Sequence, residues 1–178
     1  MEQVVIPSWL RTIDILVGAL SIALCGFVLL GLLPSSIAIL ILLTIALFMV
    51  GLARFARAAA VKAKGIYRRV VNLIAGSIGI GAAALVAFDV ELPEGILLLI
   101  LGIAWMIMGI ARILIGALEK DVAMWARILQ IVVGLATITL TSIVILITPP
   151  EFSAVVLFLS IAVIVNGFAR ASRGYVGI

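Results

Sequence analysis

The chain has 178 residues, of which 66% are hydrophobic and only 11% are charged, whereas a soluble domain is about half apolar and about a quarter charged. Too few polar side chains are present to cover a water-exposed surface, so a soluble globule is excluded. The sequence has no histidine and a single cysteine. It therefore excludes an intrachain disulfide and the usual zinc, haem and iron–sulfur ligand sets.

Six apolar segments follow one another along the chain, each near the length of about 20 residues that a membrane span requires. Prolines at 34, 93, 149 and 150 interrupt the chain between the first and second, third and fourth, and fifth and sixth segments. The sequence therefore predicts an all-α integral membrane protein made of three tight helical hairpins. The expected spans are 12–32, 35–56, 70–88, 94–117, 126–148 and 152–171.

The charged residues indicate how these spans are oriented. Six spans place all twelve lysines and arginines on one side of the membrane and Asp89, Glu91, Glu94 and Glu151 on the other. Lysine and arginine in short loops favour the cytoplasmic side. We therefore expect a multi-pass protein of the cell (inner) membrane with cytoplasmic termini, whose basic face meets anionic lipid headgroups. Nucleic-acid binding is not needed to explain the net charge of +4.

A repeat of 58 residues runs through the whole chain, as 9–66, 67–124 and 125–178 of a single membrane domain, 1–178. Each unit opens on an aromatic residue followed two positions later by arginine, and its second span closes on Gly-x-Ala-Arg. Two spans per unit make all units parallel, so we expect a pseudo-threefold arrangement about the membrane normal, with an open row as the alternative. The aligned columns are Trp9, Tyr67, Trp125; Arg11, Arg69, Arg127; Asp14, Asn72, Gln130; Gly51, Gly109, Gly167; and Arg54, Arg112, Arg170.

Each first span carries small residues along one face, and each second span has a glycine and an arginine on one face. Small residues let helices approach closely in lipid, so we interpret these faces as packing seams within or between hairpins. If the two seams face each other, the arginine of each second span lies at the same depth in the membrane as the polar residue of a first span. The pairs expected on that basis are Arg54–Asp14, Arg112–Asn72 and Arg170–Gln130.

The repeated arginines have two interpretations. In the first, they reach the lipid phosphates at the span ends. Arg54, Arg112 and Arg170 then make headgroup contacts beside the packing glycines, and the aromatic residues form an interfacial belt. In the second, Arg11, Arg69 and Arg127 form a cytoplasmic ring around the axis that binds an anion or a lipid phosphate.

Polar residues within the spans are expected mainly to join helices. Asp14 is a functional candidate because acids within a membrane are rare. Its replacement by Asn72 and Gln130 in the other units favours a hydrogen-bonding role between helices. Asn166 is interpreted in the same way, and Cys25 as a small packing residue.

Two-helix repeats that open with an aromatic residue and arginine, turn at proline and close on Gly-x-x-Arg resemble the HdeD-like family of small membrane proteins. The resemblance covers the chain from Trp9 to Arg173. It implies a six-span inner-membrane protein without established chemistry, linked in enteric bacteria to acid resistance. It supplies no catalytic residues.

These features predict a non-enzymatic membrane protein with a structural or stress-related role. Acid stress is one such stress. The first alternative is an accessory subunit of a larger membrane complex, since the loops are short. The second is a small channel or transporter with a pathway near the pseudo-threefold axis. We expect no cofactor, metal or catalytic residue, and partners limited to the lipid bilayer, other membrane subunits or further copies of the chain.

Overall fold

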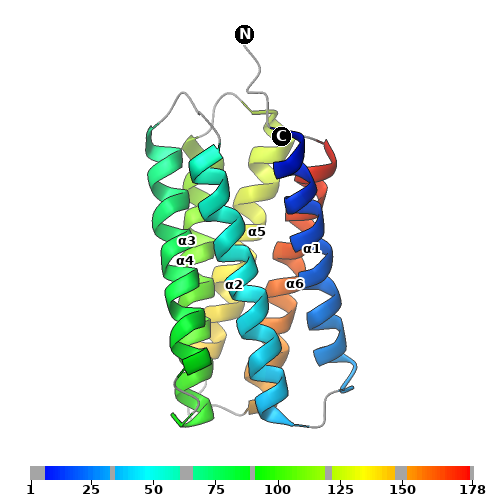
Figure 1. Ribbon diagram of the computed structural model, residues 1–178, viewed down its shortest axis with the longest axis vertical. Helices are drawn as coiled ribbons and strands as arrows, with labels where there is room; N and C mark the ends of the chain where they lie inside the picture. The colour runs from blue at the N-terminus through cyan, green and yellow to red at the C-terminus, as the bar shows by residue number, and fades with distance from the viewer. Residues whose placement is uncertain are drawn as a thin grey trace.

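The computed structural model describes residues 7–32, 35–60, 66–88, 91–118, 122–146 and 152–176. These segments contain six α-helices and no strand, and each helix is long and apolar enough to cross a membrane. The helices run alternately up and down, so the start of α1 and the end of α6 lie at one end of the bundle (Figure 1), called here the terminal end. They are α1 (Ser8–Leu29), α2 (Ser36–Ala60), α3 (Ile66–Phe88), α4 (Glu94–Leu118), α5 (Met124–Leu146) and α6 (Phe152–Val176).

All six predicted spans are confirmed as helices, but the helices extend beyond them at the terminal end. Helix α1 begins at residue 8 rather than 12, and α6 continues to residue 176 rather than 171. Hydropathy marks only the apolar stretch, whereas arginine and lysine are good helix formers and let the helix continue. The proline turns at 34, 149 and 150 lie outside the described residues.

The helices divide into a more buried and a less buried set. Helices α2, α4 and α6 contact one another and bury a larger share of their apolar windows than α1, α3 and α5 do. The side chain of Trp105 on α4 is fully buried among them, with Leu47 of α2 and Val163 of α6. Leu16 on α1 and Leu135 on α5 are more than half exposed, which suits contact with lipid tails.

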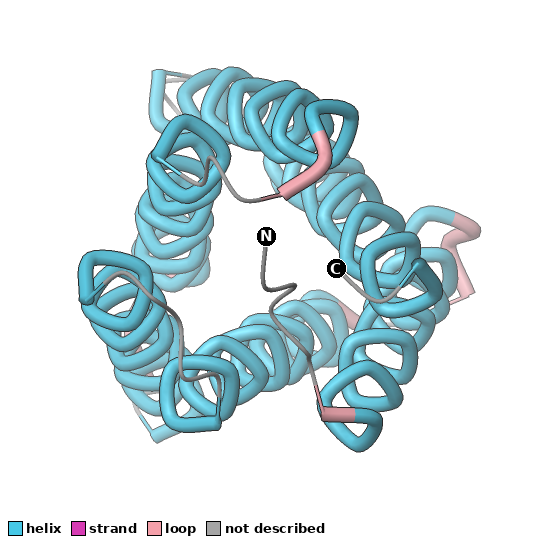
Figure 2. The backbone as a smooth tube through the Cα atoms, turned by 90° about the horizontal axis from the view of Figure 1, so that it is seen from above, coloured by secondary structure: helices cyan, strands magenta, loops and turns pink. Residues whose placement is uncertain are grey.

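Close helix pairs join consecutive hairpins rather than the two helices of one hairpin. The most extensive contacts are α2 with α3, α4 with α5, and α6 with α1. The last pair closes the bundle, as Figure 2 shows from above, so the helices do not form an open row. The small-residue seams predicted from the sequence therefore pack between hairpins.

Glycine faces glycine at each of these three close pairs. A Cβ added at Gly18 of α1 would lie 2.6 Å from the carbonyl oxygen of Gly167 on α6. Backbones this close exclude any side chain larger than hydrogen, so the glycines set the helix separation. The other two such distances are 3.0 Å from Gly76 to the oxygen of Gly51 and 2.8 Å from Gly134 to the oxygen of Gly109.

Candidate functional site: a buried arginine cluster

Six arginines are buried in the terminal half of the bundle and form what we call the arginine cluster. They come from α2, α3, α4 and α6, and the most buried is Arg112, at 1% exposure. Asp14, at 2% exposure, is the only buried acid among the described residues. Six cations and one anion are thus held away from water within a membrane bundle. The members are Arg54, Arg57, Arg68, Arg112, Arg170 and Arg173.

The cluster surrounds a small cavity. All six arginines line it, together with Asn72, Ile115 and Gln130. Its volume is about 10 Å³, measured as the space open to the centre of a water-sized molecule. With the side chains as placed, the cavity therefore has room for about one water molecule, and a larger occupant requires the flexible arginines to rotate.

The glycine pairs help to place the cluster. Arg54, Arg112 and Arg170 each follow a glycine of a close pair by three residues. Residues three apart lie on the same side of a helix, so the arginine is brought inward one turn beyond the point where the backbones meet. The same spacing places Arg57 and Arg173 on the inward faces of α2 and α6, because each lies three residues after an inward-facing arginine.

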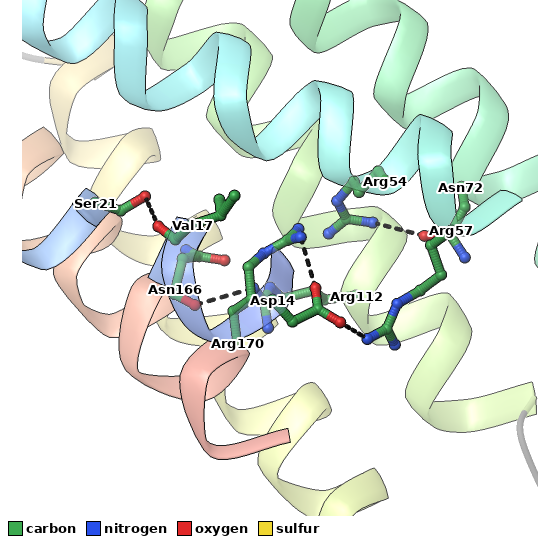
Figure 3. Close-up of polar contacts among 9 residues, drawn as sticks. All are labelled: Asp14, Val17, Ser21, Arg54, Arg57, Asn72, Arg112, Asn166 and Arg170. Carbon is green, nitrogen blue, oxygen red and sulfur yellow. Dashed lines mark hydrogen bonds and ion pairs between the residues drawn. The ribbon is translucent and has the colours of Figure 1, made fainter. Parts of the chain in front are cut away.

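Arg54 and Arg112 tether the three more buried helices to one another. Nη2 of Arg54 on α2 donates to the carbonyl oxygen of Met108 on α4, at 3.1 Å. Nη2 of Arg112 on α4 donates to the carbonyl oxygen of Asn166 on α6, at 3.2 Å (Figure 3). The two donors are 58 residues apart in the sequence, and so are the two acceptors. The two bonds therefore occupy equivalent positions in the sequence.

Asp14 joins α1 to α2 and α6. Its Oδ1 accepts a hydrogen bond from Nη1 of Arg170 at 3.0 Å, and its Oδ2 is paired with Arg57 (Figure 3). Arg170 therefore makes an ion pair, whereas Arg112, which aligns with it in the sequence, donates to a backbone carbonyl. The difference arises because Asp14 is charged, whereas Asn72 and Gln130, which align with it in the sequence, carry no charge.

The hydrogen bonds correct the predicted pairing of arginines with polar residues. Nη1 of Arg54 donates to Oδ1 of Asn72 at 3.5 Å rather than pairing with Asp14, and Asp14 pairs with Arg170 instead. Arg54 and Arg170 therefore each reach the first helix of a neighbouring hairpin, because the close contacts run between hairpins.

Several N–H groups of the cluster have no acceptor. Nε and Nη1 of Arg112, Nε of Arg54 and Nε of Arg170 are buried without a hydrogen-bond partner. Buried polar groups are normally hydrogen-bonded, and an unpaired charged donor is especially costly. The cluster therefore presents N–H groups, on α2, α4 and α6, that lack an acceptor.

The predicted cytoplasmic ring is not what lines the cavity. Nε of Arg69 donates to the carbonyl oxygen of Ala58, and Nε of Arg127 to that of Gly116, both at 3.1 Å. These arginines bond the last turns of α2 and α4, because they lie on the peripheral helices beside those ends. Arg11 is half-buried on α1 and also does not line the cavity.

The prediction of headgroup contacts for Arg54, Arg112 and Arg170 is also wrong, because all three side chains are buried inside the bundle. A Cβ added at Gly51, Gly109 or Gly167 would lie within about 3 Å of the backbone of a neighbouring helix, which suits the packing role expected of these glycines. Sequence reasoning missed Arg57, Arg68 and Arg173 as members of a site. For Arg57 and Arg173, the signal was their spacing of three residues from Arg54 and Arg170.

Other predicted polar residues are accounted for. Asn166 joins α6 to α5, since its Nδ2 donates to Oγ1 of Thr137 at 2.6 Å. Cys25 is fully buried in the apolar core, as expected for a packing residue.

At the end of the bundle opposite the terminal end, Glu91 and Glu94 are exposed, and the hydroxyl of Ser36 donates to Glu94. Asp89 and Glu151 lie outside the described residues.

The aromatic residues of the repeat lie on the outside of the bundle. Trp9 and Trp125 are exposed by nearly half, and the hydroxyl of Tyr67 donates to the carbonyl oxygen of Leu118 at 2.8 Å. Such positions suit side chains with an apolar body and a polar edge at a membrane interface. The aromatic residues and the arginine cluster therefore point in opposite directions.

The arrangement is suited to binding an anion. Arginine offers a planar fork of donors that matches carboxylate and phosphate groups. Within the described ranges no group of three acidic, cysteine or histidine side chains could hold a metal ion.

No protein-family model, curated protein or solved structure matches the chain.

Proposed function

We propose that the chain is an inner-membrane protein of three parallel hairpin repeats arranged pseudo-threefold about the membrane normal, with both termini cytoplasmic. The spacing of the helices supports the repeat, because α2, α4 and α6 begin and end 58 residues apart. The three equivalent glycine pairs support the pseudo-symmetry. The location of the described arginines toward the terminal end supports the orientation.

Within this architecture we propose a non-enzymatic protein whose functional centre is an anion-binding site in the arginine cluster. The observation that carries the proposal is the burial of six arginines around a common cavity, with a single buried aspartate, Asp14, among the described residues. A charge buried in a membrane helix is costly, and such charges mark functional sites by default. An anion in the cavity would offset that cost and accept the unpaired N–H groups.

The proposal is tested by anion-dependent stability of the purified protein. The three tryptophans report thermal unfolding in mild detergent, in sodium salts of phosphate, sulfate, acetate and chloride at one ionic strength. A ligand that binds only the folded state raises the unfolding temperature. We expect at least one oxyanion to raise it above the value in chloride. Equal values in all four salts would overturn the proposal.

A stress-related role, as the HdeD-like resemblance implies, is our proposal for the cell. It is tested by deleting the gene and measuring growth under acid and envelope stress. The wild-type gene should restore any lost growth, and a variant with Arg112→Gln should restore less if the anion site serves that role. Unchanged growth of the deletion strain under both stresses would count against it.

The contacts among α2, α4 and α6 around the cavity also favour a second candidate, a small anion channel. Flux of chloride and phosphate into liposomes that contain the purified protein tests it. A rate above that of empty liposomes, lost in the Arg112→Gln variant, would favour the channel. Tight binding without flux would favour a closed binding site.

A further inference from the structure

We propose that the anion is a phosphate group held by Arg112 and Arg54, and that the carboxylate of Asp14 restricts it to this side of the cluster by occupying Arg57 and Arg170. This inference rests on the proposed anion site and specifies its ligand and its control. It follows from the way the three equivalent arginines differ in their partners.

The Asp14 carboxylate already acts as an anion inside the cluster. It pairs with Arg57 and accepts from Nη1 of Arg170, which ties together α1, α2 and α6 (Figure 3). A carboxylate offers an arginine the same kind of oxygen acceptor as a phosphate does. Asp14 therefore competes with any bound oxyanion for these two arginines.

Among the described residues, Arg112 and Arg54 have no acidic partner. Their hydrogen bonds go to the carbonyl oxygens of Asn166 and Met108 and to the side-chain amide oxygen of Asn72, none of which carries a charge. Nε and Nη1 of Arg112 and Nε of Arg54 have no acceptor, although both side chains are buried. This side of the cluster holds the donors that an added anion would satisfy.

The number and charge of these donors favour a phosphate over a halide. At least three N–H groups on two helices lack an acceptor, and a phosphate offers several acceptor oxygens where chloride offers a single centre. Asp14 pairs with Arg57 and Arg170, so Arg112 and Arg54 present two positive charges to an added ligand, which favours a dianion over a monoanion. Arginine forks also match the planar pairs of oxygens on a phosphate.

The same phosphate chemistry has two sources, a free phosphate or a lipid headgroup. Thermal unfolding in detergent with inorganic phosphate, against chloride at one ionic strength, tests the free source. The same protein in nanodiscs of phosphatidylcholine, with and without phosphatidic acid, tests the lipid source. A free ligand is expected to act in the first comparison, and a headgroup in the second.

Three substitutions at two positions test the residues. We expect Arg112→Gln to abolish the phosphate-dependent rise, and Arg112→Lys to weaken phosphate binding about tenfold, because lysine keeps the charge but loses the fork. We expect Asp14→Asn to tighten phosphate binding about tenfold, since two arginines gain freedom to bind the ligand. A gain in affinity cannot result from misfolding, so Asp14→Asn stays informative even if Arg112→Gln fails to fold.

Matched controls remove equal charges away from the cavity. Arg127→Gln removes an arginine that bonds backbone carbonyls outside the cavity, and Glu91→Gln removes an exposed acid at the opposite end. Both are expected to leave phosphate affinity within about twofold of the wild type, because neither side chain lines the cavity and charges close to water are screened by salt.

The outcomes separate the two proposals. Failure of every anion to stabilise the wild type would overturn the proposed function and this inference together. Stabilisation of the wild type, with unchanged affinity in the Asp14→Asn variant or a full response in Arg112→Gln, would overturn this inference alone. A response to sulfate or acetate that equals or exceeds the response to phosphate would overturn the choice of phosphate.

Discussion

At the residue scale, the cluster combines a high energetic cost with few compensating contacts. Each arginine placed at the centre of a membrane helix costs about 2.5–3.5 kcal/mol on insertion scales. Asp14 offsets part of that cost for Arg57 and Arg170 through ion pairs. Among the described residues, Arg112 donates a hydrogen bond to a carbonyl oxygen, and two of its nitrogens, Nε and Nη1, have no acceptor. Packing alone gives no reason to retain such a side chain, whereas an anion site does.

Asn166 provides a prediction of a purely structural residue. Replacing Asn166 with leucine removes its side-chain bond to Thr137 on α5 and keeps a similar volume. We expect the unfolding free energy to fall by about 1 kcal/mol, as is typical of interhelical hydrogen bonds in membranes. Thr137 retains its bond to the carbonyl of Val133, so no unpaired hydroxyl adds to the loss.

This prediction is measured by unfolding in mixed micelles with increasing sodium dodecyl sulfate. The control is Thr139→Val, since Thr139 lies on the exposed face of the same helix as Thr137, and no change is expected there. A loss of more than about 3 kcal/mol in the Asn166→Leu variant would contradict a single interhelical bond and indicate a wider polar network.

At the element scale, glycines fix which helices pair. A Cβ at Gly134 would lie 2.7 Å from Cγ1 of Ile113 and 2.8 Å from the carbonyl oxygen of Gly109. We therefore expect Gly134→Ala to push α5 away from α4 and to destabilise the protein by about 1–3 kcal/mol, as overpacked cores do. Thermal unfolding of the purified variant measures the loss.

Gly81 supplies the matched control. Nothing lies within 4 Å of a Cβ added there, and alanine favours a helix over glycine by about 1 kcal/mol. Gly81→Ala is therefore expected to be neutral or mildly stabilising. Equal losses in the two variants would show that helix propensity, rather than the close approach of α4 and α5, decides the outcome.

The sequence predicted the six helices and the glycine seams but not which arginines turn inward. Hydropathy and the 58-residue spacing determine elements, because both depend only on order along the chain. Arg69 and Arg112 look alike at that level, since both recur in aligned columns near a span end. They differ because α4 is among the more buried helices whereas α3 is among the less buried ones. The burial of a helix depends on its contacts with other helices, which no local sequence pattern encodes.

At the scale of the whole molecule, the charge distribution predicts the topology. An alkaline phosphatase reporter is active only outside the cytoplasm. Fused after residue 32 or 91, at the end opposite the termini, it is expected to be active. Fused after residue 60, 118 or 176, at the terminal end, it is expected to be inactive, because all lysines and arginines lie toward that end. The inverse pattern would contradict cytoplasmic termini.

Closure of the bundle predicts tolerance of circular permutation. Helices α6 and α1 pack as closely as α2 with α3 and α4 with α5, and the start of α1 and the end of α6 lie at one end (Figure 1). Joining residue 178 to residue 1 through a flexible glycine–serine linker, and opening the chain between α2 and α3, therefore keeps every close helix pair. We expect this permutant to insert and to keep the anion-dependent stability of the parent.

The matched permutant is opened between α1 and α2, at the opposite end of the bundle. Its new termini would lie on the acidic side of the membrane. The positive-inside rule keeps the loops rich in lysine and arginine in the cytoplasm, so the new N-terminus would have to cross the membrane. It is expected to accumulate at a lower level than the first permutant. Loss of folding in the first permutant, with the parent intact, would mean that the α6–α1 contact depends on chain order. In that case the three close helix pairs would not be equivalent, and the pseudo-threefold proposal would fail.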